Sequence, residues 1–152
     1  MNKRKNKTFV RLTAMLLAVI LILPAGVNAA NAESVQPRAS YYIEAYSGYV
    51  YPAGDGEVQV WFTINGTDYM DEIGTLTIYL YESTDNQTWS LVQTYEHADN
   101  PGMLDTNDWY HSGHVSYQGV AGNYYNAYID FWAGKDGGGD SRLYRTGPDR
   151  AY

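Results

Sequence analysis

The sequence of 152 residues predicts an all-β protein, an antiparallel two-sheet sandwich of about seven strands after an N-terminal signal peptide. Two observations predict this fold class. Segments of alternating apolar and polar residues recur at short spacing between Gly, Asn, Asp and Pro clusters, and no window of ten residues shows the 3.6-residue period of a helix. The length allows one domain.

The first two predicted strands are neighbours in the sequence. Residues 41–51 form the first strand, which the turn residues 52–56 end. Residues 57–64 form the second strand and alternate cleanly. Its inward residues are Val58, Val60, Phe62 and Ile64.

The next predicted elements form a hairpin. After a loop over 65–74, residues 75–82 form the third strand. The inward residues of this strand are Leu76, Ile78 and Leu80. The turn residues 83–88 then lead into a return strand over 89–97.

The second half of the chain contains three more predicted strands, over 115–120, 123–133 and 141–146. A glycine-rich connection over 135–140 precedes the last of them. The long connection over 98–112 is the strongest candidate for a functional loop, because loops of this length are uncommon inside a compact domain.

Residues 119–128 resemble the turn into the sixth strand of immunoglobulin-like and fibronectin type III-like folds. In those folds a tyrosine hydroxyl bonds back to the backbone of the corner. Tyr125 is the first candidate for this tyrosine and Tyr124 the second, and the alternative is that either ring simply packs. The number and spacing of the strands favour the same two folds, so we predict a sandwich of this type.

The N-terminal residues have the order of a secretory signal. Five basic residues lie within residues 1–11, and an apolar run over 12–23 ends at Pro24. The run would reach about 18 Å as a helix, short of the roughly 30 Å hydrocarbon core of a bilayer. We therefore expect a secreted, extracellular protein. The predicted organisation is a signal peptide over 1–32 with cleavage after Ala29 or Ala32, a linker over 33–39, the sandwich over 40–147 and a tail over 148–152.

The charge of the chain excludes several partners. The net charge is −7, and removal of the leader leaves five basic against 17 acidic residues, a net charge of −12. The 96 residues between Arg38 and Lys135 contain 13 carboxylates and no basic side chain. Nucleic acid and anionic membrane surfaces are therefore poor partners. The absence of cysteine excludes disulfides, thiolate metal sites and a lipid anchor on cysteine.

Three segments resemble a family of small, cysteine-free, secreted proteins of unassigned function from Gram-positive bacteria. They are Tyr49-Val50-Tyr51-Pro52-Ala53-Gly54, Tyr81-Glu82-Ser83-Thr84-Asp85-Asn86 and Tyr110-His111-Ser112-Gly113-His114-Val115. The resemblance implies secretion and a β-sandwich fold, and it implies no active site.

Acidic residues predict one candidate cation site. A fibronectin-like strand order would bring the loops over 65–74, 98–112 and 134–140 to one end of the sandwich, with eight carboxylates. Calcium prefers such oxygen ligands. The predicted site consists of Asp105, Asn107 and Asp108 with a partner from Asp136 or Asp140. The alternative is that these are solvated turn residues.

Outward-facing aromatic side chains predict a ligand-binding surface on neighbouring strands. Its residues are Tyr79, Tyr81, Tyr124, Tyr128 and Trp132. Rings in a row on a sheet can stack against sugar rings. The alternatives are cross-strand pairs that only stabilise the sheet and a surface for self-association.

The sequence lacks the common motifs of catalysis: it has no nucleophile elbow, no recognisable Ser-His-Asp arrangement and no phosphate-binding glycine loop. We therefore expect a binding module and not an enzyme, with an extracellular glycan or cell-surface protein as partner and calcium as the candidate cation. We expect a monomer or a weak homo-oligomer. The alternative is a non-catalytic structural protein that self-associates in a wall or matrix, and a small secreted hydrolase is the least favoured function.

Overall fold

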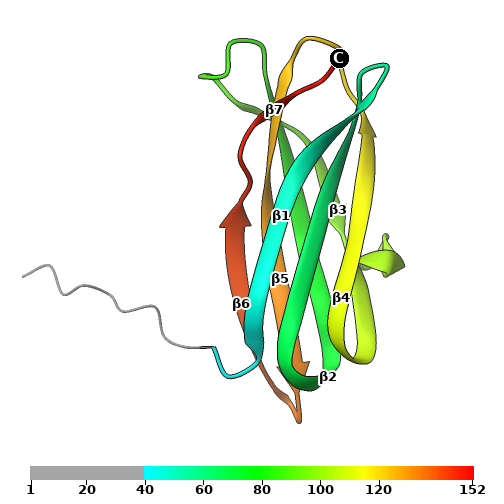
Figure 1. Cartoon of the computed structure of the whole chain (residues 1–152), viewed down its shortest axis with the longest axis vertical. Helices are drawn as coiled ribbons and strands as arrows, with labels where there is room; N and C mark the ends of the chain where they lie inside the picture. Colours follow the sequence, from blue (N-terminus) through cyan, green and yellow to red (C-terminus); the bar gives the residue numbers. More distant parts are fainter. Residues whose placement is uncertain (1–39) are drawn as a thin grey trace, which may run out of the picture. The chain divides into compact units, whose positions relative to one another are not determined.

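The computed structural model describes residues 40–152, and the predicted signal peptide and linker lie outside the described residues. Seven antiparallel strands form a single hydrogen-bonded sheet (Figure 1). The strands are β1 (Ile43–Gly54), β2 (Glu57–Ser83), β3 (Ser90–Glu96), β4 (Leu104–Gln118), β5 (Tyr124–Lys135), β6 (Gly138–Arg145) and β7 (Asp149–Arg150). A short 3₁₀ turn, Pro101–Met103, precedes β4. The predicted all-β, antiparallel fold class is confirmed.

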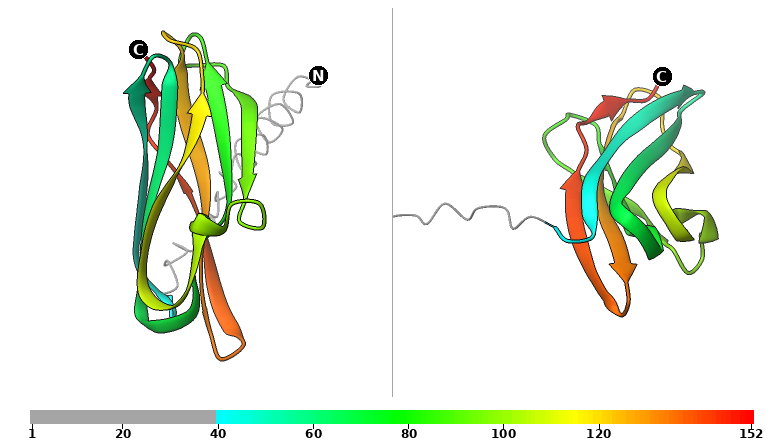
Figure 2. Two further views of the ribbon diagram at one scale, coloured as in Figure 1. Left: turned by 90° about the vertical axis from the view of Figure 1, so that its right-hand side faces the viewer. Right: turned by 60° about the horizontal axis from the view of Figure 1, so that its bottom comes forward.

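The 27-residue strand β2 organises this sheet. Its first half pairs with β1 on one edge and with the end of β4 on the other. Its second half pairs with β5 on one edge, and with β3 and the start of β4 on the other. The sheet therefore curls into a half-barrel, in which the two halves of β2 belong to two facing parts of one sheet (Figure 2).

The prediction of a loop over 65–74 is wrong, because β2 continues through these residues. Asn65, Gly66 and Asp68 have turn chemistry, but β4 remains paired with β2 on both sides of them. A register shift lies between Asn65 and Met70, and the continuous strand bends back on itself at its lower end, where Figure 1 labels β2. The separation into two distinct sheets is not confirmed, and the immunoglobulin-like or fibronectin type III-like strand order stays a prediction.

The core lies between the facing halves of the curled sheet. The predicted inward residues of the first half of β2 are all buried, and so are Ile78 and Leu80 in its second half. Leu76 is partly exposed, contrary to the prediction, while Thr75 and Thr77 are buried. A bulge between these two threonines shifts the alternation by one residue. The buried residues Tyr125, Ala127, Ile129, Phe131 and Ala133 of β5 complete this part of the core.

Two segments that the sequence predicts as irregular are strands. Within the connection predicted over 98–112, β4 begins at Leu104, and Met103 before it is buried in the core. Residues 148–152, expected as a tail, include β7, which pairs with β5, and the buried Ala151. Neither segment shows the periodicity of an isolated strand, and both are held by pairing with distant parts of the chain.

The predicted tyrosine corner is confirmed for Tyr125. Its ring is fully buried, and its hydroxyl accepts a hydrogen bond from the backbone N–H of Val120 at 2.7 Å. The same hydroxyl donates to the carboxylate of Glu82 on β2. Burial and the hydrogen bond to Glu82 raise the pKa of Tyr125 to about 12.

Across residues 40–152, no helix has the length and apolarity needed to cross a membrane.

Candidate ligand-binding groove

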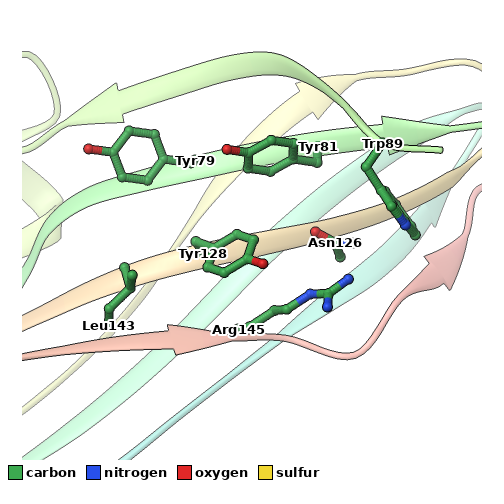
Figure 3. Close-up of a pocket in the computed structure, with 7 residues that line it drawn as sticks. All are labelled: Tyr79, Tyr81, Trp89, Asn126, Tyr128, Leu143 and Arg145. Carbon is green, nitrogen blue, oxygen red and sulfur yellow. The ribbon is translucent and has the colours of Figure 1, made fainter. Parts of the chain in front are cut away.

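A hollow of about 390 Å³ lies on the outer face of the sheet, over β2, β5 and β6 (Figure 3). We call it the aromatic groove. It is lined by Tyr79, Tyr81, Trp89, Asn126, Tyr128, Leu143 and Arg145. No acidic side chain is among these lining residues, although the chain has 17.

The register of the strands aligns these side chains. Tyr79 is the cross-strand partner of Tyr128, and Tyr128 is in turn the partner of Arg145. Tyr81 is the partner of Asn126, one position further along the same face. Directly opposed residues of antiparallel strands project from the same face, so three strands contribute to one surface.

Tyr128 occupies the centre of the groove. Its ring lies edge-on to that of Tyr81, with 5.6 Å between centroids and 70° between planes. The guanidinium carbon of Arg145 lies 5.7 Å from the Tyr128 centroid, within the range of a cation–π contact. These two contacts restrict the orientation of the Tyr128 ring in the groove.

Trp89 closes one end of the groove at the end of the β2–β3 loop. The carboxylate of Asp85 organises this loop by accepting hydrogen bonds from the backbone N–H groups of Thr88, at 2.8 Å, and Gln87, at 2.9 Å. The Ser83 hydroxyl also donates to it, at 2.9 Å. These bonds lower the pKa of Asp85 to about 2. The predicted turn over 83–88 is confirmed, and it places an indole beside the tyrosines.

Asn126 lies among the aromatic side chains of the groove (Figure 3). The residue is 1% exposed, and neither its Nδ2 nor its Oδ1 has a hydrogen-bond partner among residues 40–152. Most buried polar groups in proteins are paired, and leaving one unpaired costs about 1–3 kcal/mol. The amide of Asn126 therefore offers an unpaired donor, Nδ2, and an unpaired acceptor, Oδ1, beside three aromatic rings.

Three of the five predicted aromatic residues, Tyr79, Tyr81 and Tyr128, lie together in the groove. Tyr124 lies apart from them, with its ring 5.6 Å from the guanidinium carbon of Arg150. Trp132 lines a different hollow, beside Gly134 and Gly139, and its Nε1 is buried without a partner among the described residues.

Four of the lining residues are not among the predicted ligand-binding residues: Trp89, Asn126, Leu143 and Arg145. For Asn126, strand alternation in the sequence already predicts a place on the same outward face as Tyr124 and Tyr128. Leu143 and Arg145 also alternate on β6, but only the pairing of β6 with β5 brings them to the tyrosines.

The predicted cation ligands lie on two different parts of the sheet. Asp105, Asn107 and Asp108 belong to the start of β4, whereas Asp136 and Asp140 belong to the β5–β6 hairpin.

Several of these ligands are engaged with protein groups. Asp105 lies 3.7 Å from Nδ1 of His111, and Asp108 accepts from the backbone N–H of Trp109. Asp140 accepts from the Ser40 hydroxyl at 2.6 Å, which lowers its pKa. Within residues 40–152, no three His, Cys, Asp or Glu side chains gather closely enough to hold a metal ion. The calcium site stays a prediction.

Comparison with known proteins gives two weak structural similarities. The crystal structure of Spo0M, a sporulation control protein from Bacillus subtilis, has a TM-score of 0.37 and 12% sequence identity over 66% of this chain and 47% of that chain. A family 76 glycoside hydrolase from a bovine Bacteroides thetaiotaomicron strain has a TM-score of 0.32 and 14% identity over 69% of this chain and 20% of that chain. This chain thus spans less than half the length of either protein. No protein-family model matches the sequence, and no curated protein matches it.

Proposed function

We propose that the protein is an exported, non-catalytic binding module whose aromatic groove holds part of an extracellular or cell-surface glycan. The observation that carries the proposal is Asn126, a buried amide with two unpartnered polar atoms on a surface otherwise made of rings. A ligand that offers both an acceptor and a donor would offset the cost of burying that amide.

Sugars carry the groups that would complement the rings and the unpaired amide of this surface. The C–H face of a pyranose ring stacks on aromatic side chains, and its hydroxyl groups both donate and accept hydrogen bonds. Tyr81, Tyr128 and Trp89 supply the rings, and Asn126 supplies the polar partner. The volume of about 390 Å³ falls within the range of about 300–1,000 Å³ that is usual for small-molecule sites.

Export is part of the same proposal. Support comes from the basic and apolar order of residues 1–24 and from the acidic, cysteine-free composition. The tyrosine corner at Tyr125 supports an immunoglobulin-like or fibronectin type III-like origin of the domain. A groove on such a module would meet glycans outside the cell.

Self-association is the second candidate function, and a specific surface favours it. The rings of Tyr49, Trp61 and His114 follow one another across β1, β2 and β4, with centroids 6.4 Å and 4.4 Å apart. We call them the stacked row. Tyr49 is 54% exposed, so this row offers apolar area to a second copy of the chain.

Tryptophan fluorescence of the exported protein, titrated with a panel of wall and host glycans, tests the proposal. Binding in the groove should change the emission of Trp89, and Trp89→Phe should remove that change. Tyr128→Ala should lower the affinity for the active glycan at least about tenfold, because it removes the central stacking ring. Repeating the titration with calcium and then with a chelator tests the predicted cation dependence.

Tyr49→Ala is the matched control, since it removes an exposed tyrosine from the other half of the sheet. It should leave glycan affinity unchanged. No response to any glycan, together with a size that grows with concentration in light scattering and shrinks in Tyr49→Ala, would instead support self-association.

A further inference from the structure

We infer that the ligand of the aromatic groove carries a carboxylate, and that Arg145 binds it; the natural ligand class is an acidic sugar. This inference rests on the proposed function, because it assigns the charge of the saccharide held in that groove. Three observations on the molecule support it: the pairing state of Arg145, the position of its guanidinium and the absence of carboxylates from the groove.

Arg145 differs from other basic side chains of the domain in its partners. All acidic residues except Glu33 lie within residues 40–152, together with only four of the ten basic residues. Lys135 pairs with Asp68 at 2.6 Å, and Nε of Arg150 donates to the Gly122 carbonyl at 2.8 Å. Among the described residues, the Arg145 guanidinium contacts the Tyr128 ring and forms no ion pair with a carboxylate.

The guanidinium of Arg145 is placed where a ligand on the tyrosines would meet it. It lies 5.7 Å from the centroid of the Tyr128 ring, the ring on which we place the sugar. Packing on that ring limits the freedom of the long side chain before binding, which reduces the entropic cost of a later contact. The planar guanidinium can donate two parallel hydrogen bonds to one carboxylate, which a neutral sugar cannot accept in the same way.

The surroundings of Arg145 make this selection specific. The groove has no acidic lining residue. The nearest acidic residue along the same face of β5 is Asp130, which accepts a hydrogen bond from the Ser141 hydroxyl at 2.6 Å. The rest of the domain is strongly acidic and repels anions at long range. An anionic ligand in the groove would therefore meet this cation without competition from a carboxylate of the groove itself.

The ligand would use the groove in three places. Its ring would stack on Tyr128 and Tyr81, its carboxylate would meet Arg145, and a hydroxyl would pair with the amide of Asn126. A sugar with a carboxylate on one edge and hydroxyls on the other satisfies both polar sites at once. A neutral sugar leaves Arg145 unused.

Two pairs of probes that differ in charge test the inference by calorimetric titration of the exported protein: trigalacturonate against its fully methyl-esterified form, and sialyllactose against lactose. At least one acidic member should bind about tenfold or more tightly than its neutral counterpart. Arg145→Gln should lower the affinity for the acidic member much more than the affinity for the neutral member and so abolish that preference, while Arg145→Lys should restore part of it.

Arg142→Gln is the matched control. It removes the same charge from β6, but Arg142 is the partner of the core residue Phe131 and alternates away from the groove-lining Leu143. It should keep the preference for the acidic probe. Thermal unfolding of both variants ensures that the comparison is made on folded protein.

Three outcomes would overturn the carboxylate inference, and the first two leave the proposed glycan groove standing. Equal binding of acidic and neutral members, with loss of both in Tyr128→Ala, overturns the carboxylate and keeps the glycan groove. An equal loss of affinity for both members in Arg145→Gln, with the preference for the acidic member kept, also overturns it, because Arg145 would then serve only to position Tyr128. No binding of any probe or panel glycan overturns the inference and the proposed function together.

Discussion

The two halves of the curled sheet both present aromatic side chains to solvent, but they treat polar groups differently. In the stacked row, the rings of Tyr49 and Trp61 are nearly parallel, at 5°, and Nε1 of Trp61 donates to Gln59 at 3.0 Å. In the aromatic groove, Asn126 is buried and has no hydrogen-bond partner among the described residues. The first arrangement pairs its indole N–H within the protein, whereas the second leaves a buried amide without a partner in the part of the chain that the structure describes.

Exposed rings on a sheet do not by themselves identify a binding site, because cross-strand aromatic pairs stabilise a sheet whether or not they bind a ligand. An unpaired buried amide is different, since it costs stability in the free protein. The groove has such an amide, together with an arginine that lacks a carboxylate partner among residues 40–152.

The largest expected effect comes from the strand that joins the two halves. Gly74 lies in the second half of β2 with φ of +153°, and a Cβ there would collide with the backbone carbonyl of Met103 and lie 2.9 Å from Cα of Leu104. Gly74→Ala should lower the free energy of unfolding by at least about 3 kcal/mol, because backbone atoms must move to make room.

Urea unfolding measures this effect, with Gly102→Ala as control. A Cβ added at Gly102 would meet no atom within 4 Å, and the backbone there lies outside the left-handed region, so this replacement should change stability little. A normal midpoint for Gly74→Ala would mean that β4 does not approach β2 this closely and that the sheet curls less tightly at this point.

The next effect concerns the corner that joins Glu82 of β2 to the start of β5. Tyr125→Phe leaves the N–H of Val120 and the carboxylate of Glu82 without their shared partner, and should cost about 1–3 kcal/mol. Tyr124→Phe is the control, because Tyr124 is the other candidate for the corner and its ring instead lies near Arg150. Equal losses in chemical unfolding of the two variants would contradict the corner.

The pH dependence gives an independent measure of the same corner. The pKa of Tyr125 is raised to about 12 in the folded protein, against about 10 in the unfolded chain. The folded state therefore retains the phenolic proton more tightly, so its contribution to stability is complete below about pH 10 and is lost as the pH rises towards 12. Wild type should lose more stability than Tyr125→Phe across this interval, and parallel curves would count against the assignment.

Replacing the unpaired amide of Asn126 in the groove should increase the stability of the protein. Asn126→Leu should raise the free energy of unfolding by about 1–2 kcal/mol, because it removes two unpaired buried polar atoms, and it should weaken glycan binding. Thr75→Val is the matched control: the Thr75 hydroxyl is buried and unpartnered among residues 40–152 too, but it does not line the groove.

The two variants separate stability from binding. Thr75→Val should gain stability and keep glycan affinity, whereas Asn126→Leu should gain stability and lose affinity. Thermal unfolding and the fluorescence titration measure the two properties. A stable Asn126→Leu protein with full affinity would remove Asn126 from the site and weaken the contrast between the two halves.

The sequence predicts the parts of this structure that depend on local alternation. The buried face Val58, Val60, Phe62 and Ile64 follows from a period of two, and Tyr125 follows from its place in a corner motif. It does not predict that β2 continues through residues 65–74, because the turn propensity of Asn65 and Gly66 is overridden by pairing with β1 and β4.

The candidate site divides in the same way. Tyr79, Tyr81 and Tyr128 are adjacent through strand alternation and a correct choice of neighbouring strands. Arg145 depends on β6 adding to the outer edge of β5, and Trp89 depends on the course of a loop. Long-range register of this kind is set by the packing of the whole sheet, so a single segment of sequence does not contain it.

The smallest expected effect is on the loop that carries Trp89 to the groove. Asp85 holds this loop through the backbone N–H groups of Thr88 and Gln87, and these bonds lower its pKa to about 2. Asp85→Ala should free the indole and weaken glycan binding about two- to fivefold, because Trp89 must then be ordered on binding. Asp99→Asn, in the exposed connection after β3, should have no such effect.

The pH dependence of the groove should follow from the same carboxylate. Because the folded pKa of Asp85, about 2, lies below its usual value near 4, its bonds to the loop persist above about pH 4 and are lost as the pH falls towards 2. The Trp89 emission of the free protein should therefore shift over this acid interval in wild type and not in Asp85→Ala. An identical acid shift in both proteins would mean that a group other than Asp85 orders the loop. The ordered position of Trp89 would then not depend on this carboxylate, and only Asn126 and Arg145 would distinguish the aromatic groove from the stacked row.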